Sequence, residues 1–321
     1  TYIMPSIQLY DEGYSFSLNG YEAKVFWNIR EVEDTDGSYE RIWKLYGRRG
    51  IRNISKAVAL LRLEPLYRCL DPLRKKETIL LARHLAEGTI TKEEERHLLL
   101  SVAECYAALP EVYQSLDEPA KGQIGVHPAE VEPKPMVKLI RTLCDLFKGR
   151  KCSTYPAWAG IDNSIPLMLI SALMLYPFTR KMKPRAAMEE ADRLLADAFL
   201  EEAFNEAGYD ENARRVIPHA AALLVSAGDM YQKNSDPLAQ FAAIANDDGV
   251  MDLTQCNEYQ GEIWYNKEEM QRAILIIALS FSLSPKARGF SADEFVNIML
   301  EKELKSGYKL AALLRKEDSE D

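Results

Sequence analysis

Hydrophobic and polar residues alternate along much of the first thirty positions of the chain. The alternation covers residues 7–9, 14–18 and 21–29, and turn-forming residues separate the three runs. A period of two places the apolar side chains on one face of a β-strand. Asn19-Gly20, between the second and third runs, tolerates the positive φ angles of a tight hairpin. The pattern therefore predicts a small antiparallel β meander at the N-terminus.

A meander of three short strands has too little apolar surface to be stable by itself. Its predicted apolar face, which includes Tyr21, Val25 and Trp27, needs another sheet or a helix against it. We therefore expect residues 1–50 to be the end of a larger β domain whose other strands lie upstream.

From residue 42 onward, the apolar residues recur with the period of an amphipathic helix. Thr91 and Glu94 form a capping box at the start of one helix. Asp236, Asn266 and Ser291 are expected to be the N-cap residues of three later helices. Besides the helix that follows Thr91, helices are expected at approximately 42–46, 54–63, 73–87, 136–148, 166–177, 185–207, 211–231, 237–246, 267–283, 291–305 and 307–315.

Two stretches, Ile165–Phe178 and Ala273–Leu283, are predominantly apolar on all sides of a helix. A helix without a polar face is typical of a protein core or of a membrane span. Both stretches are shorter than the roughly 20 residues that a membrane-spanning helix needs. We therefore predict two buried core helices and no membrane partner.

The pattern as a whole predicts a mainly α protein, with one or more helical bundles and the small N-terminal β meander. Four prolines and two glycines are concentrated at 117–136, which is expected to be a linker or a long loop. The chain is therefore expected to have three parts besides this linker. Residues 1–50 hold the meander and a connecting turn, residues 51–116 form a first helical part, and residues 137–321 form the main helical domain.

The composition narrows the classes of function. A net charge of −9 over 321 residues disfavours nucleic-acid binding, which requires a basic surface. The five cysteines include no CxxC pair, so neither structural zinc nor a disulfide framework is expected. No Gly-rich phosphate loop is present, and no cofactor is expected. Cysteines within apolar helical patterns indicate a reducing compartment, so we expect a cytoplasmic location.

Acidic residues around one predicted loop are the first candidates for chemistry. They are Asp247, Asp248, Asp252, Glu258 and Glu262. Two carboxylates about 5 to 10 Å apart could hydrolyse a glycosidic bond, whereas an acidic loop can also be a solvated surface segment. Because closeness in sequence does not establish a shared site, no catalytic residue is assigned.

Aromatic residues in two predicted loops are the candidates for carbohydrate binding. They are Tyr155, Trp158, Tyr259, Trp264 and Tyr265. An aromatic ring can stack on the apolar face of a pyranose, and the same ring can instead fill a gap in a helical core. The sequence leaves both interpretations open.

The segment LNGYEAKVFWNIREVEDTDGSYERIWKLYGRRGI, residues 18–51, resembles the end of the β domain of α-amylase-family glycoside hydrolases. Gly20–Phe26 and Arg30–Val32 carry the resemblance. Asn257–Gly261 and Trp264–Glu268 are similar to a motif of a helical extension that follows this β domain in some bacterial members. In this family the β domain follows a catalytic (β/α)8 barrel, and the catalytic carboxylates belong to the barrel.

The resemblance implies that the chain is the non-catalytic C-terminal accessory region of an α-glucan-active enzyme. The implied partners are an upstream catalytic barrel in the same polypeptide and an α-glucan or oligosaccharide. Two other functions stay open at this point. A helical protein-interaction scaffold would present an apolar patch or groove, and an autonomous helical-barrel carbohydrate enzyme would present a deep acidic pocket.

Overall fold

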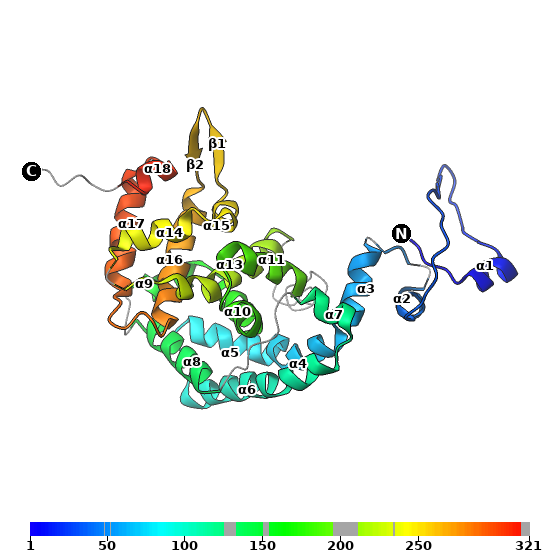
Figure 1. The fold of residues 1–321 in the computed structure, drawn as a ribbon, viewed down its shortest axis with the longest axis horizontal. Helices are drawn as coiled ribbons and strands as arrows, with labels where there is room; N and C mark the ends of the chain where they lie inside the picture. Colours follow the sequence, from blue (N-terminus) through cyan, green and yellow to red (C-terminus); the bar gives the residue numbers. More distant parts are fainter. Residues whose placement is uncertain are drawn as a thin grey trace, which may run out of the picture. The chain divides into compact units, whose positions relative to one another are not determined.

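The chain was analysed as a computed structural model that describes residues 1–47, 49–51, 53–124, 133–149, 154–194, 211–233 and 235–315 (Figure 1). The described residues are mainly α-helical, as predicted, with one small antiparallel pair of strands. Contacts between residues divide the chain into two compact units. Unit 1 comprises residues 1–65 and 116–123, and unit 2 comprises residues 66–115 and 124–321.

Unit 1 is a small helical unit with a long irregular N-terminal segment. Its helices are α1 (Ser6–Glu12), α2 (Ser38–Tyr46), α3 (Ile54–Arg62), the start of α4 (Glu64–Arg74) and α7 (Glu118–Gln123). Helix α3 packs against α2 and against α7. The core of the unit consists of Ile42, Ile51 and Ala57, against which Ile3, Val58 and Leu61 are partly buried.

The predicted position of the β meander at the N-terminus is wrong, because no strand forms among the described residues of unit 1. Residues 6–12 form α1, and residues 14–33 form no ladder of hydrogen bonds. Asn19-Gly20 does lie in a turn, in which the Glu22 N–H donates to the Asn19 carbonyl at 3.0 Å. The residue with the left-handed conformation is Tyr21, with φ of 67°. An alternating pattern needs a neighbouring strand to become a sheet, and unit 1 supplies none among its described residues.

Unit 2 contains most of the helices and the pair of strands. Its further elements are α5 (Lys76–Ala86), α6 (Lys92–Ser115), α8 (Pro133–Phe147), α9 (Thr154–Ile161), α10 (Ile165–Thr179), α11 (Pro184–Leu194), α13 (Glu211–Ser226), η1 (Ala227–Met230), α14 (Pro237–Ala245), α15 (Asp248–Leu253), β1 (Asn257–Tyr259), β2 (Glu262–Trp264), α16 (Lys267–Leu283), α17 (Ala292–Lys305) and α18 (Leu310–Leu313).

Two apolar helices form the centre of unit 2, as the sequence predicts. Helix α10 packs against α5, α11 and α13, and α16 packs against α13, α17 and η1 (Figure 1). Every residue of α10 from Ile165 to Leu175 is buried. Burying a large aliphatic side chain contributes about 1.5–3 kcal/mol, so these two helices dominate the stability of the unit.

The predicted helix starts are confirmed by their hydrogen bonds. The Glu94 N–H donates to the Thr91 hydroxyl at 3.2 Å, and the Thr91 N–H donates to the Glu94 carboxylate at 2.9 Å. Asp236, Asn266 and Ser291 each accept a bond from the N–H three residues later. These side chains satisfy N–H groups that have no partner within the helix.

Tyr155 and Trp158 were expected in a loop at 151–166, and this prediction is wrong where α9 occupies the middle of that range. Proline is tolerated in the first turn of a helix, where its missing N–H has no partner to lose. In α9, Pro156 is the third residue of the helix. The predicted linker at 117–136 likewise includes α7 and the first turn of α8, and its residues 125–132 lie outside the described residues.

Candidate functional site

Two of the five predicted carbohydrate-binding residues, Tyr155 and Trp158, lie in the core of unit 2. Their exposed fractions are 0% and 9%. The Tyr155 hydroxyl donates to the Leu275 carbonyl of α16 at 3.1 Å. Its ring centroid lies 5.8 Å from that of Phe147 and 6.0 Å from that of Trp158. In this arrangement the two rings join α9 to α8 and α16 and present no face to a sugar.

Tyr265 is also buried, with an exposed fraction of 6%. Its hydroxyl is hydrogen-bonded to the Ser306 hydroxyl and donates to the Glu303 carboxylate at 3.4 Å. The Gln271 amide donates to the same carboxylate at 2.7 Å. Burial raises the pKa of Tyr265 to about 12, so the hydroxyl stays protonated at neutral pH. This residue joins the start of α16 to the end of α17.

Tyr259 and Trp264 lie on the hairpin formed by β1 and β2, which the sequence analysis missed. Gln260 and Gly261 have φ of 53° and 76°, so both central residues of the turn are left-handed. Such a two-residue turn matches the twist of antiparallel strands, and the Gly after a polar residue was the available signal. The Trp264 ring is covered by the Lys309 ammonium, 4.9 Å from its centroid. Tyr259 is 62% exposed, so it is the one predicted ring that is open to solvent.

Three of the five acidic residues of the predicted loop are engaged in separate local contacts, and Asp252 and Glu258 are exposed. Asp247 caps α15 by accepting from the Gly249 N–H at 3.0 Å. Asp248 pairs with Arg185 at 2.9 Å, and Glu262 pairs with Lys309 at 2.5 Å. Among the described residues, no group of three or more His, Cys, Asp or Glu side chains is arranged to hold a metal ion. Asp247, Asp248 and Glu262 are therefore used in capping and ion pairs.

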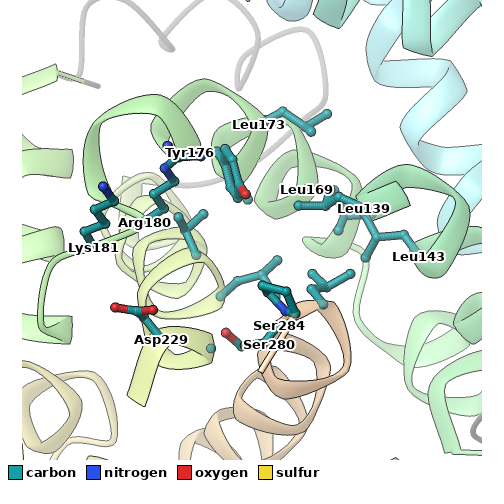
Figure 2. A pocket seen from close by; sticks show the side chains of 16 residues that line it. Leu139, Leu143, Leu169, Leu173, Tyr176, Arg180, Lys181, Asp229, Ser280 and Ser284 are labelled. Carbon is teal, nitrogen blue, oxygen red and sulfur yellow. The ribbon is translucent and has the colours of Figure 1, made fainter. Parts of the chain in front are cut away.

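A pocket with a volume of about 210 Å³ lies within unit 2, where helices from distant parts of the sequence meet (Figure 2). Its apolar wall comes from α8, α10, α13 and α16 and includes Leu139, Leu143, Leu169, Leu173, Leu224 and Leu283. Arg180, Lys181 and Asp229 lie on the opposite side of the pocket from Leu139 and Leu143. The described lining contains neither Trp158 nor Trp264. The pocket is thus apolar at one end and charged at the other.

Residues 7–32, which we call the apolar segment, expose an unusual amount of hydrophobic surface. Tyr21, Val25, Trp27 and Ile29 are all at least 82% exposed. Single exposed apolar residues are normal, whereas a contiguous run of them marks an interaction site. The apolar segment is therefore a candidate contact surface.

Comparisons with models of known protein families, with curated protein sequences and with solved structures found no match for this chain. The resemblance of residues 18–51 to α-amylase-family enzymes therefore stays a prediction. Within the described residues, no helix combines the length and the apolar character that crossing a membrane requires.

Proposed function

We propose that the chain is a non-catalytic accessory region of an α-amylase-family glycoside hydrolase and contacts the β domain of that enzyme through the apolar segment. The observation that carries the proposal is the exposure of Val25, Trp27 and Ile29, which are 82%, 86% and 83% exposed. Asn28, between Trp27 and Ile29, has a φ of 58°, so the backbone is not extended throughout this run. We call the three exposed side chains the apolar row, which the described residues leave uncovered.

Phe26, in the middle of the segment, belongs to a cluster of aromatic side chains. Phe26 packs against Tyr2, Tyr14 and Phe16, with ring centroids 5.0 to 6.0 Å apart. This aromatic cluster gives the segment a local structure. Val25, Trp27 and Ile29 stay exposed beside this cluster and are available to a partner.

The backbone of the segment supports a β-rich partner. From residue 23 to residue 33, no N–H or C=O group forms a backbone–backbone hydrogen bond to the described residues. An extended segment with free backbone groups can join the edge of a sheet, where backbone bonds supply affinity and alternate side chains supply specificity. A β domain with an open edge would satisfy both the backbone groups and the apolar row.

The energy available from such a contact is large enough to matter. Burying a Val, Ile or larger side chain contributes about 1.5–3 kcal/mol. The apolar row alone could therefore contribute several kcal/mol, a substantial part of the stability of a typical domain. The identity of the partner rests on the resemblance of Gly20–Phe26 to the last strands of the family's β domain.

The test is to isolate the native polypeptide from its source cells with an antibody to unit 2. Its mass and its hydrolysis of starch are then measured. We expect starch hydrolysis to be retained on the antibody, and a mass well above 36.5 kDa that leaves room for a barrel of roughly 250 residues. Antibody saturated beforehand with the purified chain is the control for non-specific capture. Isolation of the polypeptide without starch hydrolysis would overturn the proposal and favour a protein-interaction scaffold.

A pair of variants tests the contact surface itself. Replacing Val25 and Trp27 with Ser should lower the temperature at which the starch-hydrolysing activity is lost, because the accessory region no longer covers its partner. Leu100→Ser on α6 is the matched control, since Leu100 is 58% exposed but lies outside the apolar segment. Equal inactivation temperatures for the two variants and the unchanged protein would exclude the apolar segment as the contact.

A further inference from the structure

The pocket of unit 2 is lined by two buried polar groups that the described residues do not satisfy. The Ser280 hydroxyl and the Arg180 Nε are buried and have no hydrogen-bond partner within the described residues. Leaving a buried polar group without a partner costs about as much as a lost hydrogen bond, so such groups require an explanation. Both residues line the pocket, where a bound molecule could reach them.

The charged end of the pocket carries an excess of positive charge. Asp229 is neutralised by Lys286, whose ammonium lies 2.5 Å from its carboxylate. Arg180 and Lys181 form no ion pair with the described part of the chain. Three cations and one anion leave a local charge of about +2 in a protein whose net charge is −9. The pocket therefore favours an anion.

The guanidinium of Arg180 is held in place by its neighbour. Its Cζ lies 5.6 Å from the ring centroid of Tyr176, which also lines the pocket. A cation over an aromatic face is attracted to it, and the contact restricts the side chain. A fixed guanidinium is well suited to a carboxylate, because its N–H groups match the two oxygens.

The opposite end of the pocket limits the rest of the ligand. It is lined by leucines of α8 and α10, and Figure 2 shows Leu139, Leu143 and Leu169 there. Benzene fills an apolar cavity of about 150 Å³, so a volume of about 210 Å³ accommodates an apolar body only slightly larger than one aromatic ring. Lys181, Asp229 and Pro285 are exposed, so the charged end faces the solvent and gives access.

From this geometry we infer that the pocket binds a small amphiphilic carboxylate. The carboxylate lies at Arg180 and Lys181, and a short alkyl or aryl body lies against Leu139, Leu143 and Leu169. This site is independent of the apolar segment, since it lies within unit 2. Binding would stabilise unit 2 by joining α10, α13 and α16 through one ligand.

Calorimetric titration of the full chain with octanoate tests the inference, and 1-octanol serves as the neutral probe of the same length. We expect octanoate to bind with a Kd below about 1 mM and at least about tenfold more tightly than 1-octanol. Arg180→Gln should remove most of that preference while leaving the affinity for 1-octanol unchanged. Lys183→Gln is the matched control, because Lys183 is exposed two residues from Lys181 and does not line the pocket.

A second pair of variants covers the case in which Arg180→Gln impairs folding. Lys181→Gln removes the exposed cation and should weaken octanoate binding in the same direction. Val225→Phe places a ring in the pocket and should abolish binding of both probes, with an unchanged circular dichroism spectrum as the check of folding. Absence of octanoate binding, equal affinity for the two probes, or binding that Val225→Phe leaves intact would each overturn the inference.

Discussion

A Cβ atom on Gly228 would lie 2.8 Å from the carbonyl oxygen of Ser280, closer than real side chains approach a backbone atom. Gly228 belongs to η1 and Ser280 to α16, so the missing side chain lets these two elements touch. The contact lies at the edge of the pocket, which both residues line. Glycine is therefore required at this position by packing and not by its backbone conformation.

Replacing Gly228 with Ala should destabilise unit 2 by about 1–3 kcal/mol, because one element must move to relieve the contact. The measurement is urea unfolding followed by circular dichroism. Gly122→Ala is the matched control, since a Cβ on exposed Gly122 of α7 meets nothing within 4 Å. That variant should gain a few tenths to about 1 kcal/mol from the lower entropy of the unfolded chain. A neutral Gly228→Ala variant would show that η1 and α16 are not in close contact.

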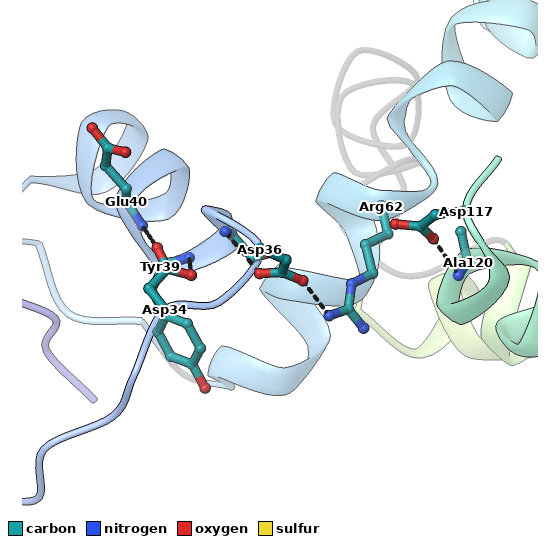
Figure 3. Close-up of polar contacts among 8 residues, drawn as sticks. Asp34, Asp36, Tyr39, Glu40, Arg62, Asp117 and Ala120 are labelled. Carbon is teal, nitrogen blue, oxygen red and sulfur yellow. Dashed lines mark hydrogen bonds and ion pairs between the residues drawn. The ribbon is translucent and has the colours of Figure 1, made fainter. Parts of the chain in front are cut away.

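The ion pair between Asp36 and Arg62 should make the stability of unit 1 depend on pH (Figure 3). The Arg62 guanidinium, 2.5 Å away, and then Ser38 hold the pKa of Asp36 well below its usual range. Because the folded state has the lower pKa, the contribution is fully present above the ordinary value of 3.8 and is lost as the pH falls below it. The Asp36 side chain is 40% exposed, so we expect only about 0.5–1 kcal/mol.

An NMR titration of the Asp36 carboxyl carbon measures this pKa directly, and Arg62→Gln should return it toward the ordinary value. Asp36→Asn should remove the corresponding difference in urea stability between about pH 6 and pH 3. Asp252→Asn, which removes the same charge from an exposed position in unit 2, is the control. An Asp36 carboxyl that titrates as a free aspartate in the unchanged protein would contradict the ion pair.

The helices were predictable because their signals are local. The start of α16, for example, is encoded by Asn266 and the N–H of Glu269, three residues apart, and the hydrogen bond between them measures 3.1 Å. Strand signals are not local in the same way. Residues 21–29 alternate as a strand does, yet they form none, because the pattern states only which face is apolar and not what covers it. The short hairpin at Asn257–Trp264 does pair, because its partner strand is two residues away.

The site was less predictable than the fold. The pocket is assembled from residues as distant as Leu139 and Leu283, and each belongs to an ordinary apolar helix pattern. A pocket depends on which side chains fail to fill the space between helices, and no spacing in the sequence records that. Aromatic residues were singled out as a sugar platform by chemistry alone, while burial places Tyr155 in the core.

Variants of Tyr155 and Tyr259 separate a structural role from a binding role. Tyr155→Phe keeps the ring but removes the hydrogen bond to the Leu275 carbonyl, so it should cost about 1–3 kcal/mol in urea unfolding. Tyr259→Ala changes a ring that is 62% exposed and should alter stability by less than about 0.5 kcal/mol. If the hairpin binds an α-glucan, Tyr259→Ala should weaken maltoheptaose binding, and Tyr155→Phe should not. The reverse result would mean that Tyr155 becomes accessible in solution.

The thiols should differ in their reactivity because they differ in burial. Burial raises the pKa of Cys105 to about 12 and that of Cys144 to about 11. It also raises the pKa of Cys69 and Cys256, which are only half-buried. Since the thiolate is the reactive species, Cys105 and Cys144 should resist alkylation by iodoacetamide at about pH 8.

Peptide mapping by mass spectrometry after timed alkylation checks this order. We expect Cys69 and Cys256 to react before Cys105 and Cys144 in the native protein, and all of them to react at similar rates in guanidinium chloride. The denatured sample is the control, because it removes burial and leaves the local sequence unchanged. Cys152 lies outside the described residues, so we predict no place for it in this order of reaction. Rapid alkylation of Cys105 without denaturant would show that α6 opens from the core of unit 2, since the thiol is 1% exposed when α6 is in place.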